Sequence, residues 1–369
     1  MPEPRILLAG GGTAGHVNPL LATAAELATH GARLTVLGTE AGLEARLVPA
    51  AGLPLRIVPR VPLPRRPSVD LLRLPARLRR AVGAAHAAIT ETGAEVVVGF
   101  GGYVATPAYL AARRLGVPVV VHEQNARPGL ANRLGARWAR HVAVSFPGTP
   151  LPRAVLTGLP LRATIRDLVA DRTADAATRR RAGAAALGLD PSRTTLLVTG
   201  GSLGAARINT ALAEGAADLV DAGVQVLHLT GAGKDAQVRS ATAGLAGYHV
   251  HSYLDDMASA YAAADLVLAR AGAGTVSELA ALGLGAVYVP LPIGNGEQRR
   301  NAADVVAAGG GLLVPDDELT ASFVRGPLRD LLSTPDRLRA MSTAAARAGI
   351  RDGATRLTEL VLDAAGAGS

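Results

Sequence analysis

Residues 264–282 combine features that suit the binding of an anion. The apolar run at 266–269 is typical of a buried parallel strand, residues 271–274 (AGAG) interrupt it, and we expect a helix at 275–282 that starts at a Thr or Ser cap. A glycine turn and a helix N-terminus present backbone N–H groups and the positive end of the helix dipole. Glu278, about one turn inside that helix, could accept hydrogen bonds from paired sugar hydroxyls. The stretch therefore predicts a nucleotide diphosphate site, although an ordinary strand–helix turn explains it equally well.

A second group of reactive residues follows the expected strand at 5–9. The segment GGGTAGH (10–16) brings His16 next to a glycine turn, and an imidazole has an unperturbed pKa suited to a general base. His16 could instead cap the helix and shape the loop. The glycine run is similar to a dinucleotide fingerprint, but Thr13 and His16 interrupt it. No acidic residue closes the next strand, where VLGT (36–39) stands, and this argues against NAD.

Four consecutive polar residues, HEQN at 122–125, end the apolar strand expected at 117–122. Open α/β sheets bind ligands at the carboxyl ends of their strands, and buried polar groups need partners. We expect Asn125 to face a ligand, and His122 and Glu123 to support the loop.

The elements that must position these residues repeat. An apolar strand, Gly-Gly-Thr/Ser, Gly and a helix occur near residue 5 and again near residue 194. The fold class is therefore α/β, with two Rossmann-like, doubly wound parallel-sheet domains. The predicted limits are 1–161 for the N-terminal domain, 162–350 for the C-terminal domain, and 351–369 for a last helix and tail that could pack back on the N-terminal domain.

Composition narrows the class of protein. The 369 residues suit two domains, and the net charge of +8 indicates an anionic partner. Aromatic residues are only 3%, which disfavours base-stacking platforms and nucleic acid. No apolar run reaches the roughly 20 residues of a membrane span, there is no signal-peptide layout, and there is no cysteine. We expect a cytoplasmic protein without disulfides or thiolate metal sites.

The segment at 65–82 predicts a basic amphipathic helix. Its apolar stripe could belong to the core, which is the commoner outcome, or rest on an anionic membrane surface. The residues of the possible membrane patch are Leu71, Leu72, Arg73, Leu74 and Arg77.

Taken in order, the motifs resemble those of the MurG family of glycosyltransferases over nearly the whole chain. They are GGTAGH at 11–16, GYV at 102–104 with Pro107, HEQN at 122–125, GGS at 200–202 with Gly204 and Ala205, DDM at 255–257, and Arg270 with GA at 272–273 and TVSE at 275–278.

This resemblance implies the GT-B fold, two Rossmann-like domains facing a cleft. It implies inverting transfer of N-acetylglucosamine from UDP-N-acetylglucosamine to the 4-hydroxyl of the muramoyl sugar of undecaprenyl-diphosphate-muramoyl-pentapeptide, which converts lipid I to lipid II in peptidoglycan synthesis. It also implies a peripheral location on the cytoplasmic face of the cell membrane and partners among cell-wall synthesis and division proteins. The resemblance also favours membrane contact, over burial in the core, as the role of the basic helix.

The resemblance also assigns site residues. The donor-binding set would be Thr13, Ala14, Gly15 and Asn125 in the N-terminal domain, Arg162 and Ser202 near the diphosphate, Leu254 against uracil, Ala273, Gly274, Thr275, Val276, Ser277 and Glu278 at the phosphates and ribose, and Gln298 on the amino sugar. His16 would be the general base, with Glu123 as the substitute.

No cofactor or essential metal is expected, because no Asp-x-Asp signature follows a strand near the donor site. We expect the adjacent Asp255 and Asp256 to cap the next helix instead. Three positions depart from the family pattern. Leu203 stands where the family usually has Gln, and Leu159 stands where it usually has Asn. Glu297 stands where Gln or Asp is common. Contacts from the side chains at these positions are not carried over.

Other classes fit less well. Another GT-B enzyme that uses a UDP-sugar is the nearest rival, either a lipid glycosyltransferase or a UDP-N-acetylglucosamine 2-epimerase. The epimerase would need a cluster of acidic residues that we do not find. An oxidoreductase that uses a nucleotide cofactor would need an acidic residue at the end of the second strand to bind the ribose, and VLGT (36–39) does not supply one. A catalytically silent sugar-nucleotide binder would not need His16, Glu278 and Gln298.

Overall fold

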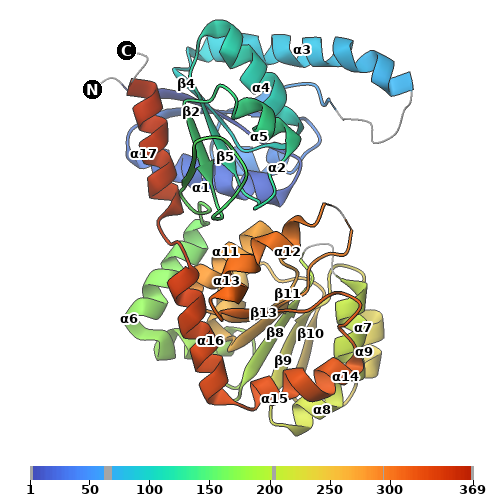
Figure 1. Ribbon diagram of the computed structural model, residues 1–369. Coiled ribbons are helices and arrows are strands. Elements are labelled where there is room, and N and C mark those ends of the chain that lie inside the picture. The colour runs from blue at the N-terminus through green and yellow to red at the C-terminus, as the bar shows by residue number, and fades with distance from the viewer. Residues whose placement is uncertain (1–2, 62–68, 202–204, 294, 367–369) are drawn as a thin grey trace. The chain divides into compact units, whose positions relative to one another are not determined.

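The computed structural model describes residues 3–61, 69–201, 205–293 and 295–366, with the backbone alone at 69–72. The chain folds as two compact units, shown in Figure 1. Unit 1 comprises Met1–Arg162 and Asp352–Ser369, and unit 2 comprises Ala163–Arg351. The chain thus returns to unit 1 for its last helix.

Within the described residues of unit 1, seven strands form one parallel sheet in the order β3-β2-β1-β4-β5-β6-β7. The order reverses beside β1, which pairs with β2 on one side and β4 on the other. Such a reversal opens a ligand-binding position at the carboxyl ends of the strands. The bounds are β1 Arg5–Ala9, β2 Arg33–Gly38, β3 Leu55–Ile57, β4 Val96–Gly99, β5 Val119–Glu123, β6 His141–Val144 and β7 Ala154–Leu156.

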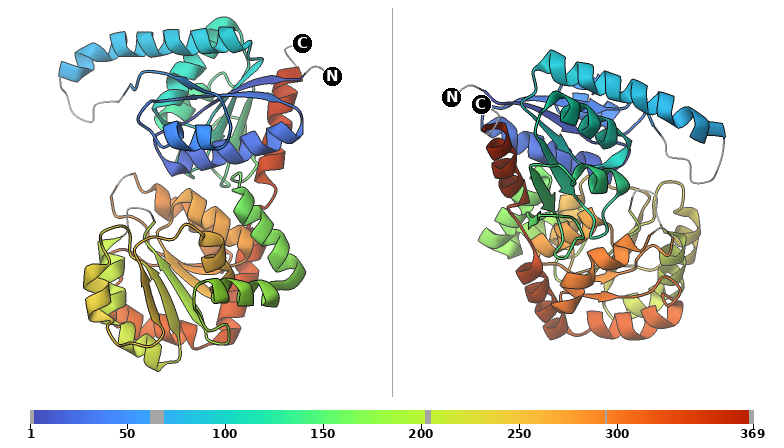
Figure 2. Two further views of the ribbon diagram at one scale, coloured as in Figure 1. Left: turned by 180° about the vertical axis from the view of Figure 1, so that it is seen from behind. Right: turned by 45° about the horizontal axis from the view of Figure 1, so that its top comes forward.

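Helices cover both faces of this sheet. Leu7 of β1 packs on the face covered by α3, α4 and α5, and its neighbours Ile6 and Leu8 pack on the face covered by α1 and α17. Successive strand residues point to opposite faces, so a strand buried on both sides is a continuous apolar run. The helices are α1 Ala14–Thr29, α2 Glu44–Ala50, α3 Val69–Thr92, α4 Gly102–Leu115, α5 Leu130–Gly135 and α17 Gly353–Gly366. Figure 2 shows the N-terminal half of α3 extending beyond the helices beside it.

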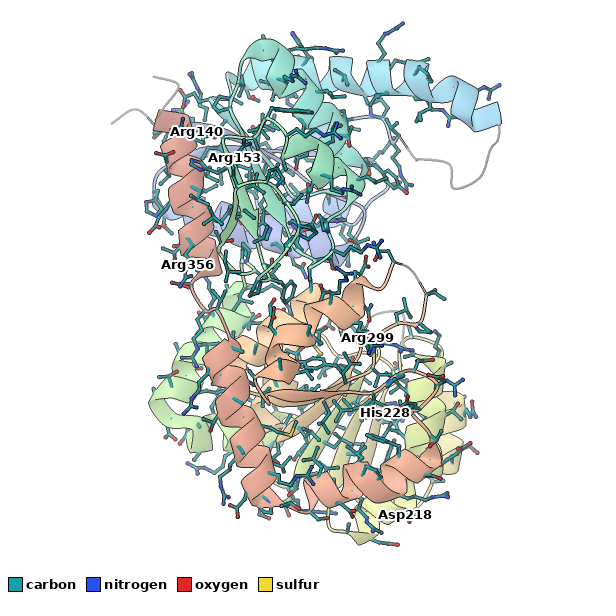
Figure 3. The ribbon with its side chains drawn as sticks, viewed as in Figure 1. Arg140, Arg153, Asp218, His228, Arg299 and Arg356 are labelled. Carbon is teal, nitrogen blue, oxygen red and sulfur yellow. The ribbon has the colours of Figure 1, made fainter. Side chains whose placement is uncertain are left out.

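In the described part of unit 2, six strands form a second parallel sheet in the order β10-β9-β8-β11-β12-β13. Among its buried polar side chains is His228 of β9, which lies among the strands, while Asp218 and Arg299 lie at the surface (Figure 3). The strand bounds are β8 Thr195–Thr199, β9 Gln225–Leu229, β10 Tyr248–His251, β11 Leu266–Ala269, β12 Gly285–Tyr288 and β13 Gly311–Leu313.

The helices of unit 2 surround this sheet. The first, α6 (Ala163–Ala186), is a charged, alanine-rich segment at the start of unit 2. It is helical on both sides of a kink at Asp175, whose φ is −153°. The remaining helices are α7 Ala206–Glu214, α8 Ala216–Asp221, α9 Ala236–Ala241, α10 Met257–Ala263, α11 Ala273–Leu282, α12 Glu297–Asn301, α13 Ala303–Ala307, α14 Ala321–Phe323, the π-helical turn Val324–Leu328, α15 Arg329–Leu332 and α16 Pro335–Ala348.

Candidate active site

In unit 1, the glycine loop after β1 leads into the exposed N-terminus of α1. Thr13 occupies the N-cap position with an extended backbone (φ −134°), and its side chain does not cap the helix. Thr13, Ala14 and Gly15 are exposed. The first N–H groups of a helix have no partner within it, so this terminus can bind an anionic or hydroxyl-rich ligand.

His16 lies in the first turn of α1 and contacts the loop through one ring nitrogen. Its Nδ1 lies 3.1 Å from the carbonyl oxygen of Gly11 and 3.1 Å from Oγ1 of Thr13. Burial lowers the pKa of His16 below its usual value, although the contact with Gly11 and the charge of Glu44 oppose this shift. The imidazole is therefore neutral near pH 7, which is the state that a general base requires.

Glu123, at the end of β5, has its carboxylate occupied by the chain's own groups. Oε1 accepts a hydrogen bond from the N–H of Asn125 at 2.9 Å, and Oε2 accepts from the N–H of Gly129 and from Nδ2 of Asn132, both at 3.0 Å. The side chain is 2% exposed, and burial raises its pKa despite these bonds. These contacts favour a structural role for Glu123, which holds the loop that carries Asn125. The Asn125 side chain is half-buried.

His122 is fully buried and also holds this loop. Its Nε2 lies 3.2 Å from the carbonyl oxygen of Gly158, and its Nδ1 lies 3.0 Å from Nε2 of Gln124. Burial lowers the pKa of His122 to about 4. Since Nε2 must donate to a carbonyl, Nδ1 accepts from the Gln124 amide, and the ring is neutral.

In unit 2, the expected anion site lies at the N-terminus of α11. The helix begins at Ala273 after the N-cap Gly272, whose backbone is extended. The prediction of a start at Thr275 with a Thr or Ser cap was therefore wrong, because the glycine occupies the cap without a side chain. The N–H of Val276 already donates to Gly272 within the helix. The N–H groups available to a phosphate are accordingly those of residues 273–275.

Side chains on the first turns of α11 differ in exposure. Ala273 and Val276 are buried in the core, whereas Gly274, Thr275 and Ser277 are half-buried. Glu278 is 8% exposed, and its Oε2 accepts a hydrogen bond from the hydroxyl of Tyr261 at 3.2 Å. A carboxylate held in this way beside a helix N-terminus suits the paired hydroxyls of a ribose.

Other candidate residues of unit 2 follow β10 and β12. Leu254 is half-buried between β10 and α10. Gln298 is half-buried on α12, and its Oε1 accepts a hydrogen bond from the N–H of Leu291 at 2.9 Å. This bond turns one end of the carboxamide to the loop, and the amide NH₂ is the group suited to a sugar hydroxyl. Ser202 and Leu203 lie outside the described residues.

The structure brings these groups to the carboxyl edge of one sheet or the other. In unit 1 this edge presents the loops after β1 and β5, and in unit 2 the loops after β10, β11 and β12. Arg162, the last residue of the first segment of unit 1, is half-buried.

Comparisons with known proteins identify the family. The glycosyltransferase family 28 N-terminal domain matches residues 6–144, and the glycosyltransferase family 28 C-terminal domain matches residues 195–357. The chain belongs to glycosyltransferase family 28. A relative from a Nocardioides species is 54% identical over 97% of this chain and 98% of its own length. A second, from Clavibacter sepedonicus, is 54% identical over 97% of this chain and 96% of its own. Both are named UDP-N-acetylglucosamine–N-acetylmuramyl-(pentapeptide) pyrophosphoryl-undecaprenol N-acetylglucosamine transferase.

Solved structures agree. The crystal structure of Acinetobacter baumannii MurG matches with a TM-score of 0.77 and 29% identity over 98% of this chain and 99% of that one. A UDP-N-acetylglucosamine 2-epimerase from Neisseria meningitidis matches with a TM-score of 0.69 but 14% identity over 98% of this chain and all of that one, which shows the fold alone. The resemblance to the MurG family and the GT-B class of two parallel-sheet α/β domains are both confirmed.

In this family 28 chain, Arg270 ties strand ends together. Its Nη1 donates to the carbonyl oxygens of Val289 and Pro290 at 3.1 and 3.2 Å and to Oδ1 of Asp316 at 2.5 Å. Oδ2 of Asp316 also pairs with Nε of Arg207 at 3.2 Å. No role of Arg270 was predicted from the sequence, and these contacts favour a role in fixing the carboxyl ends of β11 and β12.

Three further buried polar residues beside the candidate site were missed by the sequence analysis: Glu44, Asn132 and Tyr261. Glu44 bonds to Gly12, 32 residues away in the sequence. Asn132 bonds to Glu123, nine residues away, and Tyr261 bonds to Glu278, 17 residues away. The signal available was weak: a carboxylate, an amide and a phenol inside segments whose neighbours are apolar.

Across the described ranges, no group of three or more His, Asp or Glu side chains is arranged to hold a metal ion. Asp256 accepts a hydrogen bond from the N–H of Ser259 at 3.1 Å, so the prediction of a cap on α10 is confirmed for Asp256. No described helix has the length and apolarity needed to span a membrane.

Of the basic segment expected at 65–82, residues 69–82 form part of α3, and residues 65–68 lie outside the described residues. The side chains of Leu71 and Leu72 lie outside those described. Arg73 is exposed, and Leu74 and Arg77 are half-buried. Farther along the same stripe, Val82 is buried in the core of unit 1. The C-terminal part of this apolar stripe thus packs into the core of unit 1.

Proposed function

We propose that this chain transfers N-acetylglucosamine from UDP-N-acetylglucosamine to the 4-hydroxyl of the muramoyl sugar of undecaprenyl-diphosphate-muramoyl-pentapeptide, with inversion. The observation that carries the proposal is the 54% identity, over nearly the full length of both chains, to relatives named for that transfer. The site adds independent chemical support.

The donor would bind through the N-terminus of α11. The N–H groups of residues 273–275 and the helix dipole would stabilise the negative charge that develops on the departing diphosphate. Glu278 would accept hydrogen bonds from the ribose hydroxyls, and Gln298 would donate to the amino sugar. Leu254 would lie against uracil.

His16 would act as the general base. Its Nε2 would take the proton of the acceptor hydroxyl as the bond from that oxygen to the anomeric carbon forms. The bond from the anomeric carbon to the diphosphate breaks in the same displacement, and UDP leaves with the electron pair. The neutral imidazole supports this role, and the occupied carboxylate of Glu123 makes it the weaker candidate.

We further propose a peripheral position at the cytoplasmic face of the membrane and chemistry that needs no metal. An acceptor with an undecaprenyl chain stays in the bilayer, so the enzyme must reach it there. The exposed Arg73 and the half-buried Arg77 of α3 would attract anionic lipid.

The test uses purified full-length protein, UDP-N-acetylglucosamine labelled in the sugar, and a short-chain analogue of the lipid-linked acceptor, with and without EDTA. We expect label in the lipid product in both conditions, and loss of at least 100-fold in rate for His16→Ala and Glu278→Ala. His86→Ala, on an exposed position of α3, is the matched control. Donor binding without transfer would contradict the proposed acceptor. Release of a free, epimerised sugar nucleotide would favour a UDP-N-acetylglucosamine 2-epimerase.

A further inference from the structure

Glu44, the first residue of α2, is a fully buried carboxylate beside the glycine loop of unit 1. Its exposed fraction is 0%. Oε1 accepts hydrogen bonds from the N–H and the hydroxyl of Thr39 at 3.0 and 2.7 Å, and Oε2 accepts from the N–H of Gly12 at 2.8 Å. Burial opposes ionisation, but these bonds outweigh it and hold the pKa of Glu44 below its usual value. The buried group is therefore an anion.

Three glycines make room for this anion. A Cβ atom on Gly11 would lie 2.4 Å from Oε1 of Glu44, one on Gly42 would lie 2.0 Å from Oε2, and one on Gly38 would lie 2.7 Å from Cγ. Real Cβ atoms do not approach other atoms so closely. The loops after β1 and β2 thus enclose the carboxylate on several sides, and the sequence leaves little freedom in its position.

The peptide group between Gly11 and Gly12 links Glu44 to His16. Its N–H, on Gly12, donates to Glu44, and its carbonyl oxygen, on Gly11, lies 3.1 Å from Nδ1 of His16. The N–H and C=O of one trans peptide point in opposite directions, so the carboxylate and the imidazole occupy opposite sides of one planar group. Gly12 has a φ of +87°, a left-handed conformation that favours glycine.

This arrangement selects the tautomer of His16. A carbonyl oxygen only accepts, so the contact with Gly11 requires a proton on Nδ1 and leaves the lone pair on Nε2. The hydroxyl of Thr13, also 3.1 Å from Nδ1, can accept from the same proton. A carboxylate bound to the N–H end of the peptide polarises it and strengthens its oxygen as an acceptor, since chained hydrogen bonds reinforce each other.

The opposite edge of the ring faces a second glycine loop, where a side chain would crowd Nε2. A Cβ atom on Gly101, whose φ is +91°, would lie 3.2 Å from Nε2 of His16. Around the ring, the contacting groups of the loop are neutral, and Glu44 is the titratable side chain whose charge acts on it.

We propose that Glu44 is a positioning residue that acts through the Gly11–Gly12 peptide to hold His16 with Nδ1 protonated and Nε2 available as the base. It touches neither substrate, and its effect on the reaction passes through the peptide and the imidazole. The kinetic part of this inference rests on the proposed transfer activity; the tautomer does not.

The first arm of the test is independent of activity. Long-range ¹H–¹⁵N correlation spectra of the full-length protein, labelled in histidine, distinguish a protonated from an unprotonated ring nitrogen, and a His16→Gln spectrum assigns the signals. In the wild-type protein above pH 7 we expect Nδ1 protonated and Nε2 unprotonated. A wild-type His16 protonated at Nε2 would overturn the proposal without any variant of Glu44.

The second arm compares Glu44→Gln with Thr39→Val. Glu44→Gln removes the charge, and we expect a mixed tautomer, a 10- to 100-fold lower kcat, and an acid limb of the pH–kcat profile that moves to lower pH. Thr39→Val removes one hydrogen bond to Oε1 and keeps the charge and the bond from Gly12. This control should lower stability, keep the tautomer and the acid limb, and retain kcat within about twofold.

The outcomes separate the two proposals. A wild-type protein that does not transfer sugar but shows the Nδ1-protonated His16 rejects the proposed function alone. An active wild type whose Glu44→Gln variant keeps both the tautomer and the acid limb rejects the role of Glu44. If Glu44→Gln does not fold, Glu44→Asp takes its place, because it keeps the charge but shortens the side chain that reaches the N–H of Gly12. A mixed tautomer in Glu44→Asp supports the proposal, and an unchanged tautomer and acid limb contradict it.

Discussion

The hydroxyl of Tyr261 donates a hydrogen bond to Oε2 of Glu278 across 3.2 Å. The two side chains are 4% and 8% exposed and come from α10 and α11, the helices on either side of β11 in the chain. A phenol placed in this way fixes the direction of the carboxylate that we expect to bind ribose. Tyr261 is therefore a second buried side chain that contacts a residue of the proposed site, comparable to Glu44 beside His16.

Replacing Tyr261 by Phe tests this relationship. Loss of one hydrogen bond to a charged group should weaken UDP binding by about 1–2 kcal/mol, a 5- to 30-fold higher Kd in calorimetry, with kcat changed less than twofold. The control is Tyr288→Phe, because Tyr288 is buried in the same unit and its hydroxyl has no hydrogen-bond partner within the described structure. Equal Kd values for the two variants would show that Tyr261 does not orient Glu278.

Gln298 offers a test of sugar recognition. Gln298→Glu keeps an oxygen to accept from the N–H of Leu291 but replaces the NH₂ donor by an anionic oxygen. We expect kcat/KM for UDP-N-acetylglucosamine to fall about 10- to 100-fold, since a lost donor and a like charge near the diphosphate both oppose binding. The Kd for UDP, which lacks the sugar, should change less. A larger loss for UDP than for the sugar nucleotide would place Gln298 at the phosphates instead.

The sequence predicted the fold class from local patterns. Strands buried on both faces appear as short apolar runs such as 96–99 and 266–269, and glycine turns after them mark the carboxyl edge of each sheet. These signals lie within a few residues of each other, so they can be recognised without tertiary information. The start of α11 was misplaced because Gly272 serves as the N-cap by backbone conformation alone, which no side-chain pattern reports.

The contacts that position the site could not be predicted in the same way. Glu44 is 32 residues from Gly12, and its environment arises only when the loops after β1 and β2 meet. Glu123 was expected as a substitute base or as loop support; its three internal hydrogen bonds favour support, and two of its partners lie six and nine residues away. The residue types were visible in the sequence, but their partners depended on the register of distant segments.

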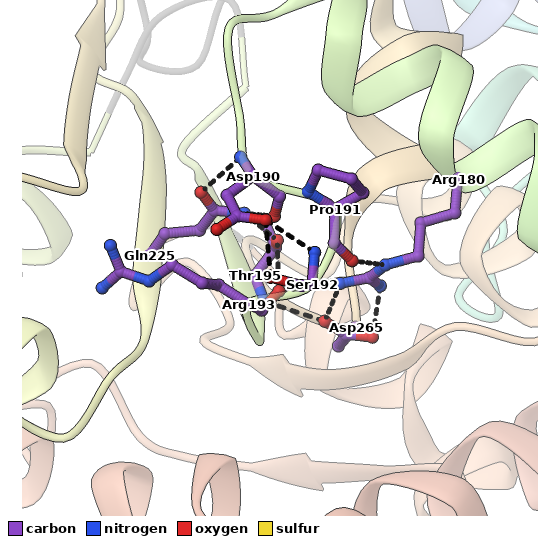
Figure 4. A network of polar contacts seen from close by, with 8 residues as sticks. All are labelled: Arg180, Asp190, Pro191, Ser192, Arg193, Thr195, Gln225 and Asp265. Carbon is purple, nitrogen blue, oxygen red and sulfur yellow. Dashed lines mark hydrogen bonds and ion pairs between the residues drawn. The ribbon is translucent and has the colours of Figure 1, made fainter.

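A polar network at the amino edge of the sheet of unit 2 gives a prediction about stability alone. Arg180 of α6 pairs with both carboxylate oxygens of Asp265, at 2.5 and 2.9 Å, and Asp265 also accepts from the N–H of Thr195 at 2.8 Å (Figure 4). Thr195 is the first residue of β8 and Asp265 directly precedes β11, whereas the candidate site follows the strands.

Asp265→Asn should therefore destabilise unit 2 by about 1–3 kcal/mol, because it breaks a charge-assisted bidentate pair and leaves one donor without an acceptor. A lower thermal midpoint, together with an unchanged Kd for UDP, is the expected result. Asp218→Asn is the control, since its pair with Arg325 is more exposed and worth at most about 1 kcal/mol. A changed Kd for UDP in Asp265→Asn would show coupling between the two edges of the sheet.

The stability of unit 1 should fall in mild acid because of His122. Burial lowers the pKa of this ring to about 4, below the value of about 6.5 in an unfolded chain. Between these values the unfolded state binds the proton and the folded state does not, so the contribution of neutral His122 is complete above pH 6.5 and is lost as the pH falls toward 4. The loss could reach about 3 kcal/mol at about 1.4 kcal/mol per pKa unit.

Trp138, the single tryptophan of the chain, lies in unit 1 and reports its unfolding by fluorescence. We expect the urea midpoint of the wild type to decrease from pH 7 to pH 4.5, and the decrease to be smaller in His122→Asn, which cannot take up the proton. His86→Asn, at an exposed position of the same unit, should keep the wild-type decrease. Equal decreases in all three proteins would assign the acid sensitivity of unit 1 to groups other than His122.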